Sequence, residues 1–240
     1  MNKYIFPLLI IKSLFILASF TQELPLGYIL LYSQNFSGRN PLTDFSFSAP
    51  VSWKISGDRH NYFMNFPEKI NHADSTGRPN TLAILSSHMY SDFIMELDIM
   101  TTGEGQADRG ICIVYGFKDT SNYYYIRLAS IAGEDSHNVF LVNKTVLTKI
   151  SAKTSESINL ENNKWHKVKV IRNILEKTIT VYFNDMINPV MKAKDRTLIM
   201  GYIGFGSAGS AGKIDNINIW APTSVPGDAD VFEKISLPDN

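Results

Sequence analysis

Apolar and polar side chains alternate along most of the chain with a period of two, which predicts β-strands rather than helices. In the segment DFIMELDIM, residues 92–100, the apolar odd-numbered positions would share one face of a strand, and Glu96 and Asp98 would share the other. Polar, turn-forming loops separate such segments, and no stretch has a convincing helical period. The expected strands before the closing region span residues 28–32, 53–55, 62–66, 81–85, 92–100, 110–117, 122–128, 139–142 and 146–150.

The last third of the chain carries the strongest strand signals. β-Branched and aromatic residues fill WHKVKVIR (165–172), TITVYFND (178–185) and GYIGFGSAGSAGKIDNINIW (201–220), and Asn-Asp and glycine-rich turns interrupt them. We therefore expect three closing strands. Successive strands follow one another at close to the spacing of about 8–12 residues that is typical of sandwiches, so the pattern predicts an all-β fold of two antiparallel sheets.

The N-terminus is typical of a secretory signal peptide, with Lys3 followed by apolar runs at residues 4–11 and 14–20. A membrane anchor is the alternative, but Lys12 separates the two runs, and neither reaches the roughly 18–20 apolar residues that span a bilayer. We expect a signal peptide at 1–21, one sandwich domain at 22–221, and a C-terminal tail at 222–240 that is loose or adds at most one edge strand. The protein would then be secreted or periplasmic in a bacterium, with no membrane span after processing.

Charge and cysteine content narrow the function classes. The formal net charge is zero and no basic patch stands out, which argues against nucleic acid as a partner. The single cysteine, Cys112, cannot form an internal disulfide, and its apolar surroundings predict a small buried side chain. The chain offers no further signal for its oligomeric state.

A run of motifs then resembles a known group of proteins. The motifs are SDFIMELDI, DRGICIVYGF, NYYYIRLAS, HNVFLVN, WHKVKVIR, ITVYFND, GYIGFGS and GKIDNINIW. Together they resemble concanavalin A-like jelly rolls of the laminin-G type, and most of all the bacterial 3-keto-disaccharide hydrolase group. The resemblance covers residues 28–220 and implies a jelly-roll sandwich that binds glycans on its concave face or rim. The chain differs from that group at residues 208–211, where it has Ala-Gly-Ser-Ala in place of an acidic pair. Any cation that such a pair would hold is therefore in doubt here.

The best ligand-binding candidates lie in NYYYIRLAS. Tyr124 would point into the core, whereas Tyr123, Tyr125 and Arg127 would point to the opposite face. Tyrosine rings can stack on the C–H face of a sugar, and a guanidinium can donate to its hydroxyls, so this face could bind saccharide. A second buried layer or a subunit contact are the alternatives. Two further candidates are Arg109 and Trp53.

Three residues are candidates for catalysis. Glu96 and Asp98 share a strand face, and paired carboxylates cleave glycosides, although a solvated polar face is the simpler explanation for them. The laminarinase-type pattern E-x-D-x-x-E is broken here by Thr101. His137 follows two acids in a loop and could act as a general base, with an ordinary turn contact as the alternative. His166 has the parity of a core or rim histidine.

A structural calcium ion is the one cofactor that the sequence suggests. Asp215 shares the parity of inward-facing residues near the start of a strand, and a buried carboxylate needs partners. The jelly-roll resemblance implies that such an aspartate can hold Ca²⁺, with Asp44 as a second oxygen ligand. Capping of loop amides is the alternative. The glycines of residues 201–212 precede no helix and therefore form no phosphate loop.

Two main functions follow. The first is a secreted, non-catalytic module that binds an oligo- or polysaccharide. The second is a glycoside-cleaving hydrolase or lyase, as the family resemblance implies, and a third is a laminin-G-like domain that binds protein. We favour binding, because each catalytic candidate has a simpler structural explanation.

Overall fold

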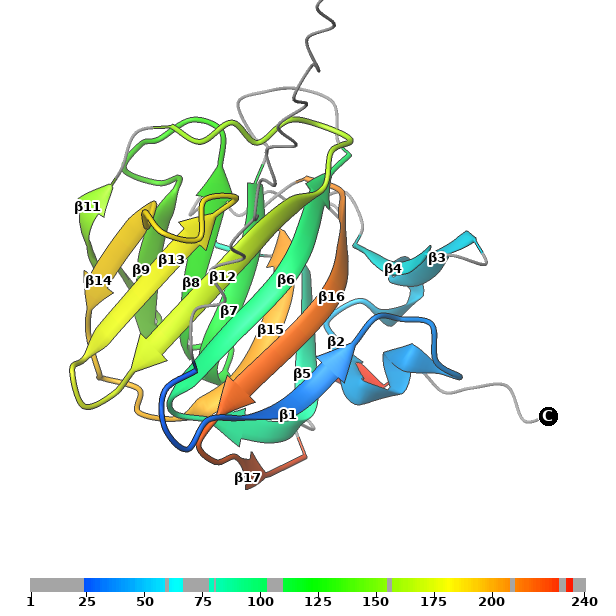
Figure 1. The fold of residues 1–240 in the computed structure, drawn as a ribbon, viewed down its shortest axis with the longest axis horizontal. Coiled ribbons are helices and arrows are strands. Elements are labelled where there is room, and N and C mark those ends of the chain that lie inside the picture. Colours follow the sequence, from blue (N-terminus) through cyan, green and yellow to red (C-terminus); the bar gives the residue numbers. More distant parts are fainter. Residues whose placement is uncertain are drawn as a thin grey trace, which may run out of the picture.

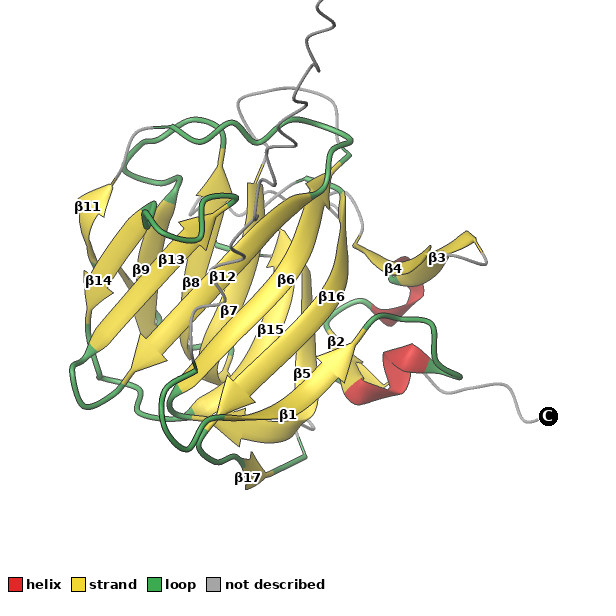
Figure 2. Cartoon of the chain, in the orientation of Figure 1, coloured by secondary structure: helices red, strands yellow, loops and turns green. Residues whose placement is uncertain are grey.

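The computed structural model describes residues 24–58, 61–66, 78–79, 81–102, 110–154, 157–207, 210–228 and 232–234. Two antiparallel sheets lie face to face, and the described helices are limited to two single turns (Figures 1 and 2). The prediction of an all-β, two-sheet jelly-roll sandwich is confirmed. The leader at residues 1–21 and the ligand-binding candidate Arg109 lie outside the described residues.

The first sheet is in front in Figure 1. Its hydrogen-bonded order is β11 (Ser151–Thr154), β14 (Met191–Lys194), β13 (Thr178–Phe183), β12 (His166–Asn173), β6 (Phe93–Thr101), β16 (Gly212–Ala221), β4 (Asn61–Phe66) and β3 (Lys54–Asp58), and β1 (Ile29–Gln34) pairs with β16. The second sheet has the order β10 (Val146–Lys149), β9 (Asn138–Asn143), β8 (Asn122–Ala129), β7 (Gly110–Asp119), β15 (Gly201–Ser207), β5 (Thr81–Tyr90), β2 (Phe45–Phe47) and β18 (Glu233–Lys234), and β17 (Val225–Pro226) pairs with β5. The two short helical turns are η1 (Pro41–Asp44) and η2 (Pro50–Ser52), and neither is a candidate for a membrane span.

The main core fills the space between the sheets. On β6 the odd-numbered apolar residues Phe93, Met95, Leu97 and Ile99 are all buried there, as the alternation predicts. On β8 the inward residues are Tyr124, Ile126 and Leu128. The parity of both strands was therefore predicted correctly, and the inner faces of the two sheets form one continuous apolar layer.

One charged side chain enters this core. Arg172 is only 1% exposed, and its guanidinium lies 5.3 Å from the ring centroid of Tyr115 and 5.4 Å from that of Tyr124. It also donates a hydrogen bond to the Leu198 carbonyl. Burial lowers the pKa of Arg172, while the two ring faces and the carbonyl compensate in part for its lost hydration.

The outer face of the second sheet carries a second apolar layer. Its buried members are Leu82, Ile84, Cys112, Val114, Phe117, Tyr123, Tyr125, Phe140, Val142 and Tyr202. Phe232, from the C-terminal tail, packs on this layer with its ring 6.0 Å from that of Phe117. Cys112 is buried here, as predicted, and the second sheet is thus apolar on both faces.

The C-terminal tail is more ordered than the sequence suggested. We expected a loose tail or at most one edge strand, but its described part forms β17 and β18, which pair with β5 and β2. The Gly227 N–H also donates to the Ser87 carbonyl at 2.9 Å. The expectation was wrong because such short pairings have no periodicity of their own and depend on an edge already present in the sheet.

The closing region also differs from the prediction. Residues 201–220 were expected to form one strand, yet β15 lies in the second sheet between β7 and β5, and β16 lies in the first sheet beside β6. The chain thus changes sheets between the end of β15 at Ser207 and the start of β16 at Gly212. The short strands β2, β11 and β14 were not predicted, because three or four residues are too few to show alternation.

Gly201 tests how tightly β15 fits against β7. A Cβ atom at this position would lie 2.3 Å from the Gly116 carbonyl carbon and 2.7 Å from the Phe117 nitrogen, both rigid backbone atoms. We expect Gly201→Ala to lower the free energy of unfolding by about 2–3 kcal/mol, because the sheet must shift to admit a methyl group. Urea unfolding followed by circular dichroism measures this loss.

Gly38→Ala is the matched control. Nothing lies within 4 Å of a Cβ atom at Gly38, so this change should stay within about 0.5 kcal/mol of the unchanged chain. Equal unfolding midpoints for the two variants would contradict the close approach of β15 and β7.

Candidate functional site

β8 ends and β12 begins at the same end of the sandwich (top of Figure 2). An open hollow lies at this end, lined by residues that follow β8 and precede β12. Its volume is about 500 Å³. It lies between the β8–β9 connection and the segment that leads from β11 to β12. The lining residues are Ser130, Ile131, Ile158, Asn159, Leu160, Glu161 and Asn162. We refer to it below as the end hollow.

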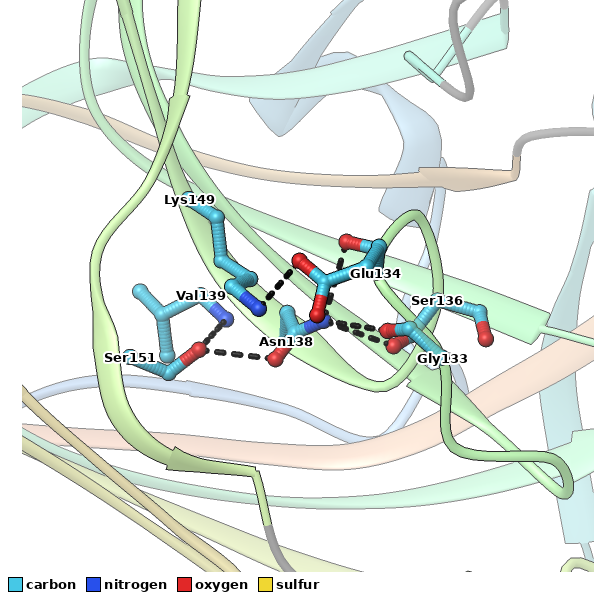
Figure 3. Close-up of polar contacts among 7 residues, drawn as sticks. All are labelled: Gly133, Glu134, Ser136, Asn138, Val139, Lys149 and Ser151. Carbon is cyan, nitrogen blue, oxygen red and sulfur yellow. Dashed lines mark hydrogen bonds and ion pairs between the residues drawn. The ribbon is translucent and has the colours of Figure 1, made fainter.

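Asn138 fixes the shape of the β8–β9 connection (Figure 3). Its amide Nδ2 donates to the carbonyls of Gly133, Ser136 and Glu134 at 2.6, 2.9 and 3.2 Å. Its Oδ1 accepts a hydrogen bond from Ser151 Oγ at 2.8 Å. Because Asn138 is fully buried, these bonds are shielded from water, and the loop has a defined conformation without a ligand.

Further contacts join the two walls of the end hollow. Ser130 Oγ donates to the Leu160 carbonyl at 3.3 Å, and the Ala132 N–H donates to Ser157 Oγ at 3.3 Å. On the other side of the loop, Lys149 forms an ion pair with Glu134 (Figure 3). The walls are therefore held at a fixed separation, as a pre-formed binding site requires.

Glu161 is the charged group of the end hollow. Its Oε1 accepts hydrogen bonds from Lys164 Nζ at 2.8 Å and from Asn159 Nδ2 at 2.9 Å. The hydrogen bond and charge of Lys164 hold the pKa of this exposed carboxyl below its usual range. Glu161 is consequently ionised at neutral pH, where it accepts hydrogen bonds from hydroxyl groups and has no proton to donate.

Apolar side chains complete the end hollow. Ile158 and Leu160 are buried and belong to the main core, so they form a floor, whereas Ile131 is 50% exposed at the rim. Alternation along residues 158–161 places these apolar residues beside Asn159 and Glu161. The lining of the end hollow therefore combines apolar surface with hydrogen-bonding groups.

Sequence reasoning did not find this site. Residues 151–163 fell between the expected strands and were given no role, although Ile158 and Leu160 alternate there with Asn159 and Glu161. That alternation was the available signal. Its meaning depends on contact with Ser130 and Ile131, which are remote along the chain.

The predicted tyrosine surface is not open. Tyr123, Tyr125 and Arg127 do lie on the face opposite Tyr124, as expected. However, Tyr123 is 4% exposed and Tyr125 is 1% exposed, and Tyr125 stacks on Phe140 with 4.7 Å between ring centroids. The expectation of a free aromatic platform was therefore wrong, because this face forms the second buried layer that we had considered as the alternative.

Arg127 and His137 both reach the β8–β9 connection from inside. Arg127 Nη1 donates to the Asp135 carbonyl at 2.9 Å, and His137 Nδ1 accepts from the Ala129 N–H at 3.4 Å. His137 is fully buried, and burial lowers its pKa to about 4, so the ring is neutral near neutral pH. Both side chains thus shape the loop, and the position of His137 gives it no access to a substrate in solution.

Glu96 and Asp98 share the outer face of the first sheet, as predicted. Asp98 accepts a hydrogen bond from Asn216 Nδ2 at 2.9 Å and forms an ion pair with Lys167 at 3.5 Å. Both carboxylates are partly exposed, and neither lines the end hollow. Their surroundings are those of a solvated polar face.

Trp53 does not lie at a ligand surface. It is 3% exposed and packs between Phe47 and Phe66, with ring centroids 5.3 and 6.2 Å away. The prediction that Trp53 contacts a sugar was wrong, because this ring belongs to the main core. His166 is buried as expected, with Nε2 3.2 Å from the Glu161 carbonyl oxygen.

The two aspartates suggested for calcium have separate surroundings. Asp44 Oδ2 accepts hydrogen bonds from the Tyr32 hydroxyl at 2.8 Å and from Gln34 Nε2 at 3.0 Å. Asp215 Oδ1 accepts from the Asn216 N–H at 2.7 Å. Within the described ranges, no group of three or more His, Cys, Asp or Glu side chains could hold a metal ion, and the calcium site stays a prediction.

Comparisons with known proteins support the fold. No protein-family model matches the chain, and no curated protein matches its sequence. Among solved structures, the carbohydrate-binding module CBM66 of Bacillus subtilis is 16% identical with a TM-score of 0.54, over 75% of this chain and 97% of that one. A Bacillus subtilis protein of unknown function with a galectin-like fold is 13% identical with a TM-score of 0.54, over 80% and 97%.

A third neighbour was solved with a sugar. Domain 4 of AbnA, an extracellular arabinanase of Geobacillus stearothermophilus, in complex with arabinotriose, is 10% identical with a TM-score of 0.51, over 84% of this chain and 94% of that domain. At these identities the likeness establishes the fold alone, a concanavalin A-like jelly roll of the kind found in lectins and carbohydrate-binding modules.

Asp215 provides a test of buried charge. Burial, followed by the nearby Asp98, raises its pKa from 3.8 to about 6, so folding favours the protonated form. Protonated Asp215 therefore contributes its full stabilisation below pH 3.8, the pKa in the unfolded chain, and this contribution is lost as the pH rises through about 6. We expect Asp215→Asn to raise the free energy of unfolding by about 1–3 kcal/mol near pH 7.5, and by almost nothing near pH 4.

We would measure the stability of both proteins by thermal unfolding near pH 7.5 and pH 4, with and without added calcium chloride. The Asn amide oxygen can still accept the Asn216 N–H, so the change removes mainly charge. A calcium ion bound by Asp215 would give the reverse result: added calcium would raise the Tm of the unchanged chain, and Asp215→Asn would abolish that rise.

Proposed function

We propose that this protein is an exported saccharide-binding module that holds its ligand in the end hollow and does not cleave it. The observation that carries the proposal is the end hollow itself, an open hollow of about 500 Å³ whose lining combines hydrogen-bonding groups with some apolar surface. Sugars need both kinds of surface, because their rings present C–H faces and their hydroxyls donate and accept hydrogen bonds.

Glu161 would make the strongest single contact. A carboxylate oxygen accepts hydrogen bonds from sugar hydroxyls, and charge-assisted bonds of this kind are stronger than neutral ones. Asn159 and Lys164 already orient the Glu161 carboxylate, so little rotational freedom is lost when a ligand arrives. Ile131 offers an exposed apolar contact on the same rim.

The structural neighbours support this class of ligand. One is a carbohydrate-binding module by name, and another was solved in complex with arabinotriose. Both share the jelly-roll fold with this chain, which makes saccharide the first ligand class to test. The leader at residues 1–21, with its apolar runs, supports export to where such glycans occur.

Binding fits the geometry better than glycoside cleavage. A hydrolase related to the 3-keto-disaccharide hydrolase group would need an acid that is protonated at working pH, and the pKa of Glu161 is lowered rather than raised. The other candidate acids, Glu96 and Asp98, do not line the end hollow, and His137 is buried. The experiment below therefore measures glycan hydrolysis alongside binding, and hydrolysis would contradict the proposal.

Glu161→Ala tests the proposal. The purified protein is applied to a glycan array that includes arabinose, arabinotriose, galactose and galactotriose, and each bound glycan is then titrated by calorimetry. We expect Glu161→Ala to weaken binding by at least about tenfold, because the variant loses a charge-assisted hydrogen bond to the ligand. The release of reducing sugar is measured in parallel, and none is expected.

Glu176→Ala is the control variant, since Glu176 is an exposed acid in the β12–β13 turn at the other end of β12. It should bind like the unchanged protein. An array with no bound glycan, an equal loss in both variants, or product formation that Glu161→Ala abolishes would each overturn the proposal.

A further inference from the structure

Two aromatic side chains lie side by side on the outer face of the first sheet, close to the end hollow. Trp165 directly precedes β12, and Phe63 lies on β4, two strands beyond β6. Their ring centroids are 5.8 Å apart at an interplanar angle of 68°, which is an edge-to-face contact. Both rings remain partly exposed, so they lie at the surface and not in the core.

A cation completes this cluster. Lys213 Nζ, from β16, lies 4.6 Å from the centroid of the Phe63 ring, within the range of a cation–π contact. Two strands and the residue that precedes a third therefore contribute to one surface feature, which we name the aromatic shelf: Trp165, Phe63 and Lys213. Phe63 and Lys213 are held by their strands, and the edge-to-face contact holds the Trp165 ring against Phe63.

The aromatic shelf and the end hollow are close together in the sequence. Asn162 lines the hollow and Trp165 follows three residues later, so their Cα atoms are at most about 10 Å apart. Between them, Lys164 extends back to Glu161 through its 2.8 Å hydrogen bond. Lys164 thus links the rim of the hollow to the base of the shelf.

We propose that the two features form one extended site for an oligosaccharide, in which the end hollow takes one sugar unit and the following unit stacks on the aromatic shelf. This inference rests on the proposed function and adds the ligand's length to it. Aromatic faces contact the C–H face of a pyranose or furanose ring and tolerate variation in its hydroxyls. Affinity should accordingly increase with chain length, while the hollow alone decides which terminal unit fits.

Trp165→Ala is the decisive variant, on the same array and in the same titrations. We expect it to weaken binding of di- and trisaccharides by about fivefold or more and to leave binding of the matching monosaccharide unchanged. Trp165→Phe keeps an aromatic ring, so we expect it to retain most of the affinity for di- and trisaccharides. Thermal unfolding confirms that each variant is folded before it is titrated.

Trp220→Ala is the matched control, because Trp220 is also a partly exposed tryptophan of the first sheet, paired there with Leu30 and Ile94 at a distance from the shelf. It should bind every glycan like the unchanged protein. Identical array profiles for Trp165→Ala and the unchanged protein, or an equal loss for monosaccharide and trisaccharide, would overturn the extended site alone. An unchanged protein that binds no glycan would overturn the proposed function and this inference together.

Discussion

The burial of the second sheet on both faces is the constraint on which the architecture depends. Its inner face packs against the first sheet across the main core, and its outer face carries a second apolar layer that includes Tyr123 and Tyr125. A sheet of this kind must be covered on both sides, since exposing a contiguous apolar face of this size to water is unfavourable. The C-terminal tail supplies part of that cover through Phe232, β17 and β18. The outer face of the second sheet is thereby closed, and the site that we propose lies among the loops at one end of the sandwich instead.

The β8–β9 connection is ordered by polar contacts. Asn138 donates to three of its carbonyls, Arg127 reaches it from β8, and His137 reaches it from the residue before β9. Each of these side chains is buried, so each bond is made in a low dielectric where its loss would be costly. Two residues that the sequence suggested as functional groups, Arg127 and His137, thus contribute by positioning the wall of the end hollow.

The sequence predicted which side chains of a strand share a face, but it did not predict which of the two faces is exposed to water. In NYYYIRLA the alternation separates Tyr124 from Tyr123 and Tyr125, and the structure follows it. Yet tyrosine suits a wet face and a buried face equally, so nothing local could show that the outer layer is closed. The end hollow could not be predicted for a different reason. It forms where Ser130 contacts Leu160, and a contact between residues so far apart in the sequence produces no periodic pattern. The same limit applies to Trp53, whose burial follows from Phe47 and Phe66 on other strands.

The place of β1 has a consequence for how the chain acquires its structure. β1 pairs only with β16 among the described strands, and the Ser33–Asn218 hydrogen bond joins residues separated by 185 positions. β1 therefore cannot pair until β16 (Gly212–Ala221) has been synthesised. Pairings of such high contact order form slowly, so the first sheet remains incomplete until this late strand is in place.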